Sequence, residues 1–598
     1  MTCPKTGICG GCLYQGVPYQ EQIEEKALEV RKLFERKGIP VGEFRGIQGS
    51  PEQYRYRNKM EYSFGDEVIG GEMTLGMHKA GSYMSIVTTD CCQIVPDDFN
   101  RILRAVLDFC TERGYTFYHK KRKNGLLRNL ILRRGVRTGE LLINLVTSSD
   151  PGFDEEAFVS LLCSLPLDDH VVGVLRTYND SISDAILCEK LEVLYGRDYY
   201  EEEIMGLKFK VSAFSFFQTN VPAVETLYTE ALSLLDHPEG KRIFDLYCGT
   251  GTISQALALQ AKEVVGVELI PEAVEAAKRS AERNGLENCT FIAGDVLKVL
   301  DDEALAAPPD VIVVDPPRSG IHPKAWKKIL NYGVKEILYI SCSPGSLAVN
   351  LEHIEDMGYH VETLKLYDNF PFTKHTECVA KLVKKDYPKM VLFDLDGTLW
   401  DSAQSVAESW NQVLSHAPED VPEMTADTIH SVMGKSMDEI AEILFHMMTP
   451  ERRAEVLEAC CKWENAYVSK HGGILYPKLI ETLQILKDKG YGLAIVSNCQ
   501  SGYIPAFLRS SGLELMFVDY EEWGNTRRPK GENILSVLQR NGAEKSVYVG
   551  DTQGDQNAAN FAGVPFIHAS YGFGTSEAPE AILKRFEDLP ALLEAMEF

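Results

Sequence analysis

The segment DLYCGTGTISQALA (residues 245–258) decides the fold of the longer, N-terminal part of this chain. The apolar residues up to Tyr247 indicate a buried strand, Gly249 and Gly251 indicate a tight turn, and ISQALA indicates the start of a helix. Small residues at a strand-to-helix turn let a nucleotide-like ligand approach the backbone and the helix N-terminus. The segment therefore predicts the ligand-binding turn of a doubly wound α/β sheet.

Further strands follow and end in acidic residues. Glu268, Asp295 and Asp315 close the segments EVVGVE, TFIAGD and DVIVVD. Ser254 replaces the third glycine of the G-x-G-x-x-G pattern, Glu268 is placed to accept ribose hydroxyls, and Asp295 is placed to accept the adenine amine. This pattern favours S-adenosylmethionine over a dinucleotide. We predict a Rossmann-like domain over residues 206–385.

A cysteine and a glutamate complete the series. YISCSPGSL (339–347) places Cys342 at the carboxyl end of a strand, and HTEC (375–378) places Glu377 in the final strand region. The ordered set FFQTN (216–220), DLYCGTG, DPPRSG (315–320), SCSP and HTE resembles the uracil-C5 RNA methyltransferase family over about residues 1–384. Without that order, Cys342 alone would more often be a buried structural residue.

The resemblance implies a mechanism and a set of ligand contacts. Cys342 would be the nucleophile that adds to uracil C6, and Glu377 the base that removes the C5 proton. Ser343 stands where family members usually have Asn, which affects fine positioning. The residues implied to contact the methyl donor are Gln218, Tyr247, Gly249, Gly251, Thr252, Glu268, Asp295 and Asp315.

The first residues hold a C-x5-C-x2-C cluster of Cys3, Cys9 and Cys12 in a segment too poor in bulky apolar residues to fold alone, which predicts a metal site. TTDCCQIVP offers Cys91 or Cys92 as a fourth ligand. The family resemblance favours Cys92 and implies a four-iron, four-sulfur (4Fe-4S) cluster, while zinc uses the same ligand set. The cluster is expected to order the N-terminal segment and the RNA face.

VLFDLDGTLWDS (391–402) opens a second α/β series after a linker at KKDYPK (384–389). The D-x-D-G-T motif resembles the haloacid-dehalogenase-like phosphatases across residues 390–598, with a helical cap at about 401–476 as in phosphoglycolate-phosphatase-like members. The resemblance implies magnesium-dependent hydrolysis of a small phosphate ester. The implied residues are Asp394 (nucleophile), Asp396 (acid/base), Ser497 with Asn498 (phosphate), Lys530 (charge clamp), and a magnesium set of Asp394, Asp396, Asp551 and Asp555.

The length and net charge of the chain limit the functions that these motifs can indicate. The 598 residues carry a net charge of −26, which argues against indiscriminate coating of nucleic acid, but residues 389–598 alone contribute −14. The stretch from Arg101 to Arg137 has 11 basic and two acidic residues with interleaved aromatics, which predicts a local RNA contact, although a solvated face is the plain alternative. No run is long and apolar enough to span a bilayer, and no signal peptide is evident.

We therefore predict an α/β multidomain chain. Its parts are a cluster segment (1–50), a β-rich RNA-contacting module (51–205), the methyltransferase domain (206–385) and the phosphatase-like domain (386–598). The expected protein is a cytoplasmic, monomeric, bifunctional enzyme without membrane partners, and the short start before Cys3 favours 23S rRNA over tRNA as substrate. The alternatives are a tRNA methyltransferase whose C-terminal domain binds or regulates, an iron–sulfur redox or radical RNA-modifying enzyme, and a non-catalytic RNA-binding scaffold.

Overall fold

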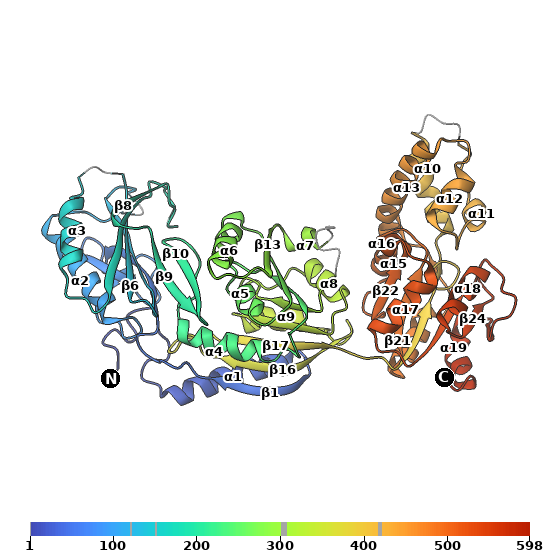
Figure 1. Cartoon of the computed structure of the whole chain (residues 1–598), viewed down its shortest axis with the longest axis horizontal. Helices are drawn as coiled ribbons and strands as arrows, with labels where there is room; N and C mark the ends of the chain where they lie inside the picture. The colour runs from blue at the N-terminus through green and yellow to red at the C-terminus, as the bar shows by residue number, and fades with distance from the viewer. Residues whose placement is uncertain (1, 120–121, 150–151, 184, 301–307, 417–420) are drawn as a thin grey trace. The chain divides into compact units, whose positions relative to one another are not determined.

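The computed structural model describes residues 2–119, 122–149, 152–183, 185–300, 308–416 and 421–598. The chain forms two compact units: residues 1–352 with 361–383, and residues 353–360 with 384–598. Figure 1 follows the chain from blue to red through both units, which are described one at a time below. Among the described residues, none of the helices combines the length and apolarity that crossing a bilayer requires.

The first unit contains an eight-stranded sheet, which includes the strands expected for the Rossmann-like domain. In sheet order its strands are β1 (Val41–Gln48), β16 (Tyr359–Tyr367), β17 (Glu377–Lys384), β15 (Glu336–Ser341), β14 (Val311–Val314), β11 (Arg242–Leu246), β12 (Glu263–Glu268) and β13 (Cys289–Ala293). Strands β11 to β15 pair in parallel, and β17 is antiparallel to β15. Every residue of β14 and β15 is buried, because helices cover both faces of a parallel sheet.

The helices of this domain alternate with the strands, as a doubly wound fold requires. They are α4 (Val221–Leu232), α5 (Thr252–Ala258), α6 (Pro271–Arg283), α7 (Val296–Val299), α8 (Pro323–Asn331) and α9 (Pro344–Leu351). Helix α1 (Tyr19–Arg36) comes from the N-terminal segment. Its buried Lys26 Nζ pairs with Asp368 Oδ1 at 2.7 Å, which ties the N-terminal segment to the end of β16.

The β-rich module of the first unit is a seven-stranded sheet. In sheet order its strands are β4 (Ile86–Thr88), β3 (Met73–His78), β2 (Lys59–Asp66), β5 (Leu127–Arg134), β6 (Glu140–Thr147), β7 (His170–Tyr178) and β8 (Lys190–Gly196). Two helices, α2 (Asp97–Glu112) and α3 (Glu155–Ser164), accompany it, and α3 makes the crossover between the parallel strands β6 and β7. The hairpin of β9 (Tyr199–Ile204) and β10 (Leu207–Ser212) follows.

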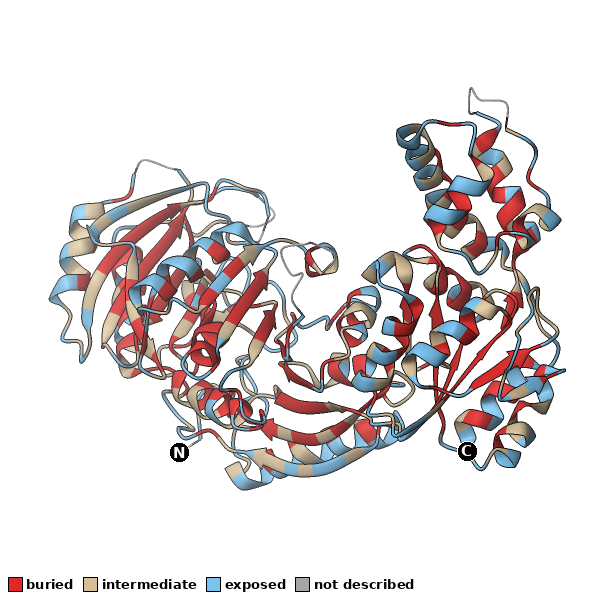
Figure 2. Cartoon of the chain, turned by 45° about the vertical axis from the view of Figure 1, so that its right-hand side comes forward, coloured by how far each residue is buried: buried red, intermediate tan, exposed pale blue. Residues whose placement is uncertain are grey.

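The second unit contains a six-stranded parallel sheet. Its order is β22 (Asp519–Glu522), β21 (Gly492–Ser497), β18 (Lys389–Phe393), β23 (Lys545–Gly550), β24 (Phe566–Ala569) and β25 (Ala581–Leu583). The helices of the sheet layer are α14 (Leu479–Asp488), α15 (Tyr503–Ser511), α16 (Trp523–Thr526), α17 (Lys530–Arg540), α18 (Gln553–Ala562) and α19 (Leu589–Ala595). Figure 2 shows buried residues concentrated on these strands and on the helix faces that meet them.

A helical cap is inserted between β18 and β21. The short strands β19 (Trp400–Asp401) and β20 (Ile474–Leu475) pair antiparallel at its base. The cap helices between them are α10 (Ala403–Leu414), α11 (Ala426–His430), α12 (Met437–Leu444) and α13 (Pro450–His471). The insertion expected at about 401–476 is therefore helical, and its base lies next to the carboxyl end of β18.

Candidate active sites

The turn at residues 247–252 joins β11 to α5 and requires its glycines. Gly251 has φ +77°, and a Cβ there would lie 2.7 Å from the ring of Phe291. Tyr247 adopts the same left-handed region at φ +69°. The Gly249 N–H donates to Glu268 Oε2 at 3.0 Å, so the glycine turn and the acid that ends β12 are in direct contact. This pair sits at the carboxyl edge of the sheet, where doubly wound folds bind ligands.

The other residues expected at the methyl donor lie along the same edge. Thr252 is the first residue of α5, and Asp295 follows β13 with its carboxylate accepting from the Leu297 N–H at 3.0 Å. Gln218 donates from Nε2 to the Tyr228 hydroxyl at 3.0 Å, and burial and the charge of Asp315 raise the pKa of Tyr228. The side chains of Gln218, Tyr228 and Asp315 therefore lie near one another.

Cys342 and Glu377 are neighbours because β17 runs antiparallel to β15. The register pairs Ser341 with Cys378, so the next positions, Cys342 and Glu377, face each other where the two strands meet. Burial raises the pKa of the Glu377 carboxyl to about 7. Burial, followed by the charges of Glu377 and Asp315, also raises the pKa of the Cys342 thiol. The Cys342 thiol and the Glu377 carboxyl are therefore close together and partly shielded from water.

Arg318, in the DPPRSG motif, also belongs to this group, although the sequence alone predicts no role for it. Its positive charge opposes the rise in the pKa of both Cys342 and Glu377, and its guanidinium contacts the thiol. The Nη2 atom also lies 3.3 Å from Nδ1 of His375. Arg318 lies three residues after Asp315, which directly follows β14, and this position at the carboxyl edge of the sheet could have indicated that it belongs to the site. Arg318 therefore supplies the cation of a site otherwise rich in acids.

The four N-terminal cysteines expected to bind metal line one cavity. Cys3, Cys9, Cys12 and Cys92 border it together with Ile94 and neighbouring polar residues, whereas Cys91 does not border it. Burial raises the pKa of the Cys12 thiol to about 11 and that of Cys92 to about 12. The backbone of Cys92 is fixed by Asn100, whose Oδ1 accepts from its N–H at 3.1 Å.

Most arginines of the basic stretch from Arg101 to Arg137 form ion pairs or are buried within the first unit. Five of its arginines form ion pairs with acids outside the stretch: Arg101, Arg104, Arg113, Arg134 and Arg137. Two others, Arg128 and Arg133, are buried. Lys120 and Lys121 lie outside the described residues. Arg122 and Lys123 are exposed. The stretch presents less exposed charge than its composition indicates.

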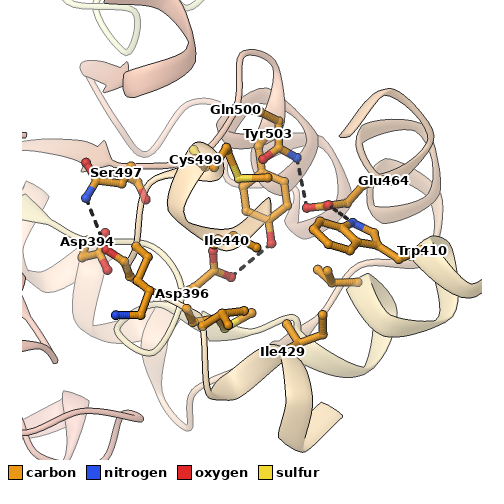
Figure 3. A pocket seen from close by; sticks show the side chains of 17 residues that line it. Asp394, Asp396, Trp410, Ile429, Ile440, Glu464, Ser497, Cys499, Gln500 and Tyr503 are labelled. Atoms are coloured by element: carbon orange, nitrogen blue, oxygen red, sulfur yellow. Dashed lines mark hydrogen bonds between the residues drawn. The ribbon is translucent and has the colours of Figure 1, made fainter. Parts of the chain in front are cut away.

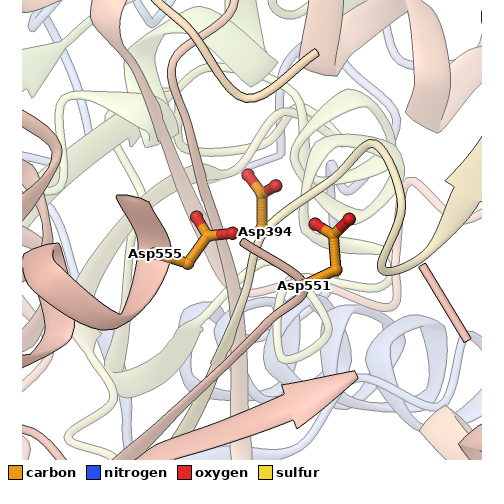
Figure 4. Close-up of side chains that lie close together, drawn as sticks. All are labelled: Asp394, Asp551 and Asp555. Carbon is orange, nitrogen blue, oxygen red and sulfur yellow. The ribbon is translucent and has the colours of Figure 1, made fainter. Parts of the chain in front are cut away.

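In the second unit, three aspartates converge at the carboxyl edge of the sheet. Asp394, Asp551 and Asp555 each offer a carboxylate oxygen, and these oxygens lie within 4.8 Å of one another (Figure 4). Lys530 Nζ donates to Asp394 at 2.8 Å and to Asp555 at 2.6 Å. Burial raises the pKa of Asp394 to about 6 and that of Asp551 to about 8. Three buried carboxylates whose oxygens lie this close together suit a hard divalent cation.

Asp396, which was assigned to the same magnesium set, points elsewhere. Its carboxylate accepts from Ser402 Oγ at 2.6 Å and from the Tyr503 hydroxyl at 3.1 Å. Burial raises the pKa of Asp396 to about 7. Its side chain is therefore outside the group of three carboxylates and is fixed by two hydroxyl donors. Ser497 ends β21 and lines the same pocket as Asp394 and Asp396 (Figure 3).

Comparison with known proteins identifies both halves. The family model of tRNA (uracil-5-)-methyltransferases matches residues 155–385, and that of haloacid dehalogenase-like hydrolases matches residues 391–569. A protein of Clostridium tetani named as an uncharacterized RNA methyltransferase is 45% identical over 384 residues, covering 64% of this chain and 84% of that protein. A protein of Caldanaerobacter subterraneus with the same description is 48% identical over 382 residues, with the same coverage of both chains.

A solved structure supports the N-terminal assignment. The tRNA (uracil-54, C5)-methyltransferase of Pyrococcus abyssi in complex with S-adenosyl-L-homocysteine is 26% identical, with a TM-score of 0.52, and the match covers 62% of this chain and 86% of that one. Both resemblances drawn from the motifs, and the α/β fold class, are confirmed. The chain belongs to the uracil-C5 RNA methyltransferase family and carries a haloacid dehalogenase-like hydrolase domain in its C-terminal part.

Proposed function

We propose that the first unit transfers a methyl group from S-adenosylmethionine to C5 of a uridine in RNA. The observation that carries the proposal is the strand register that sets Cys342 beside Glu377. The Cys342 thiolate forms a bond to C6, and the electron pair of the C5–C6 double bond moves to C5, which takes the methyl group. Glu377 then removes the C5 proton, the double bond re-forms, and the bond between sulfur and C6 breaks.

The residues around the glycine turn fit the methyl donor. Gly251 keeps the backbone open beside Phe291, and Glu268 offers carboxylate oxygens suited to ribose hydroxyls. When bound, S-adenosylmethionine would supply an electrophilic methyl group. The positive charge of Arg318 favours the thiolate of Cys342, which is the reactive form of the nucleophile. A stacked helix would hide C5 and C6, so the uridine is expected to be flipped out of an RNA loop.

A covalent trap tests the proposed methylation of uridine. The full-length protein is incubated with the methyl donor and RNA containing 5-fluorouridine, whose fluorine Glu377 cannot abstract. We expect a stable protein–RNA complex that Cys342→Ala abolishes and that Cys188→Ala, at an exposed cysteine, leaves intact. Absence of the complex in the unmodified protein, or its persistence in Cys342→Ala, contradicts the mechanism. Separate 23S rRNA and tRNA pools identify the target: the sequence resemblance favours rRNA, whereas the solved relative is named for tRNA.

We further propose that Cys3, Cys9, Cys12 and Cys92 hold a 4Fe-4S cluster. In tetrahedral zinc sites, bonds of about 2.3 Å require sulfurs about 3.8 Å apart. Among the described residues, the only group of three or more candidate ligand atoms within 4.8 Å of one another is the aspartate group, so no three of the four thiols are as close together as the ligands of a zinc ion. The cluster would cross-link the N-terminal segment to the loop after β4; the methyl transfer itself consumes no electrons.

Substitution of the two adjacent cysteines distinguishes the ligand. Cys92→Ser is expected to remove the visible absorbance and bound iron of anaerobically purified protein, because of the two adjacent cysteines only Cys92 borders the cavity. Cys91→Ser is the matched control and is expected to retain both. Equal loss in the two variants, or stoichiometric zinc in place of iron, contradicts the assignment.

For the second unit we propose magnesium-dependent hydrolysis of a phosphate monoester. Asp394 attacks phosphorus and the bond to the ester oxygen breaks, while Asp396 donates a proton to the leaving alcohol. Asp396 then takes a proton from the water that cleaves the phosphoaspartate. Asp394, Asp551 and Asp555 would hold Mg²⁺, which offsets phosphate charge when bound. Lys530 already neutralises part of the carboxylate charge.

Hydrolysis of an aryl phosphate tests this proposal. We expect turnover that requires Mg²⁺ and is lost in Asp394→Asn. Asp396→Asn is expected to slow turnover as well, because it removes the group that exchanges the proton. Activity that survives Asp394→Asn unchanged would show that the hydrolysis belongs to another site or protein.

A further inference from the structure

The cavity between the cap and the sheet of the second unit has two chemically different ends. Asp394, Asp396 and Ser497 line one end, and Glu464 of the cap helix α13 lines the other (Figure 3). Its volume is about 60 Å³. By the same measure, a cavity needs roughly 10–15 Å³ to hold one water molecule. The cavity therefore suits a leaving group of a few non-hydrogen atoms.

The walls between the two ends are mainly apolar. They are formed by Val406, Ile429, Val432, Met433, Met437 and Ile440. The Tyr503 ring lies between Asp396 and Glu464 in Figure 3, and its hydroxyl is already engaged by Asp396. Such walls accept methylene groups and give no partner to a polar group in the middle of the ligand.

Glu464 is a buried carboxylate without a cationic partner. Its residue is 4% exposed, Oε1 accepts from Gln500 Nε2 at 3.0 Å, and Oε2 accepts from the Trp410 indole N–H. No described lysine, arginine or histidine forms an ion pair with it. Lys435, the basic residue among those that line the cavity, is exposed. Burial raises the pKa of Glu464 to about 7, as expected for a carboxyl that lacks a compensating charge.

The two donors hold the carboxylate in place but do not neutralise it. Trp410 and Gln500 are neutral, and each uses one hydrogen bond on one oxygen, so each oxygen keeps a further lone pair. A buried charge is costly unless it is paired. A ligand that reaches this end of the cavity and carries a positive charge would complete the site, whereas a second carboxylate would be repelled.

We propose that the phosphatase substrate is the phosphate ester of a small amino alcohol, with its ammonium group bound by Glu464. The proposal rests on the phosphatase function and adds the chemistry of the leaving group. It assigns Glu464 as the specificity residue, with Trp410 and Gln500 as its positioning residues. It also distinguishes this pocket from one built for an anionic ester such as phosphoglycolate.

Binding and turnover are measured separately so that the two proposals fail in different ways. Calorimetry with full-length Asp394→Asn protein and Mg²⁺ compares ethanolamine phosphate with propyl phosphate, which has the same shape without the charge, and with phosphoglycolate. We expect ethanolamine phosphate to bind at least about tenfold more tightly than propyl phosphate, and phosphoglycolate to bind most weakly. In Asp394→Asn/Glu464→Gln protein the preference is expected to fall to about twofold or less, while Asp394→Asn/Glu458→Gln, altered at an exposed position on the same helix, is expected to retain it.

Equal binding of the three esters, no binding of any, or a preference that survives Glu464→Gln overturns the assignment of Glu464. Aryl phosphate hydrolysis by the unmodified chain reports on the phosphatase function alone. A preference for ethanolamine phosphate without any hydrolysis would retain the pocket and reject the catalysis.

Discussion

Replacement of Lys530 by Met should destabilise the second unit strongly. Lys530 Nζ bridges Asp394 and Asp555, and the lysine and aspartate side chains are only 1–5% exposed. Met preserves most of the volume and removes the charge, which leaves the buried carboxylates of Asp394, Asp551 and Asp555 close together. Loss of one partner of a buried ion pair typically costs about 3–5 kcal/mol. In a unit of this size, about 3 kcal/mol lowers Tm by roughly 6–12 °C.

Tryptophan fluorescence can report on the unfolding of the second unit alone. Four of the five tryptophans lie in residues 384–598, so Trp326→Phe makes the signal specific to it. Thermal unfolding of Lys530→Met in that background is compared with Lys584→Met, an exposed lysine on the same unit, which is expected to change Tm by less than about 2 °C.

The destabilisation should depend on pH and on Mg²⁺. Lys530 lowers the pKa of Asp394, so its removal raises that pKa further above the value in the unfolded chain. A carboxyl with a raised pKa in the folded state loses stability as pH rises, so the cost should be larger at about pH 8 than at about pH 5.5. Mg²⁺ should restore more stability to the variant than to the parent. A loss below about 1 kcal/mol, or one that is equal at both pH values, would refute this account.

Three further predictions concern the first unit. Methyl transfer in single turnover should rise with pH through about 7, because burial raises the pKa of Glu377 to about 7 and the base must be ionised; a rate that falls over that range contradicts its role. Gly251→Ala should lower the free energy of unfolding by about 1–3 kcal/mol and weaken binding of S-adenosylhomocysteine, since φ is +77° and the new Cβ meets Phe291; unchanged calorimetric affinity would refute the role of the turn. Lys26→Met should cost about 3–5 kcal/mol in denaturant titrations, because it leaves Asp368 buried and unpaired; a change within about 0.5 kcal/mol would contradict this.

The strands of both Rossmann-like sheets could be predicted because their signals are local. VIVV of β14 and EILYIS of β15 are continuous apolar runs apart from Glu336 and Ser341, as expected of strands buried on both faces. A glycine at position 251 predicts a turn with positive φ, because a residue without a side chain adopts this conformation at no steric cost. Such features depend on a few adjacent residues, so they can be predicted without knowledge of the tertiary contacts.

Charge and metal assignments were less predictable. The arginines between 101 and 137 read as an RNA-binding stretch, yet several pair with acids that lie outside the stretch, such as Asp168 and Glu225. Asp396 and Asp394 are two residues apart, but only Asp394 joins the carboxylates of Asp551 and Asp555. Composition counts charges, whereas burial and the direction of each side chain decide whether a charge is available.

The sequence by itself determined the two α/β series, because strand periodicity and glycine turns are local signals. The order of the motifs determined, through its resemblance to two known families, that the chain combines a uracil-C5 methyltransferase domain with a hydrolase domain. The tertiary structure decided which residues meet. Cys342 and Glu377 are adjacent only through the antiparallel pairing of β17 with β15, and Glu464 reaches the hydrolase pocket only because the cap folds back onto the sheet. Contacts between segments distant in sequence depend on register and packing, which no local pattern encodes.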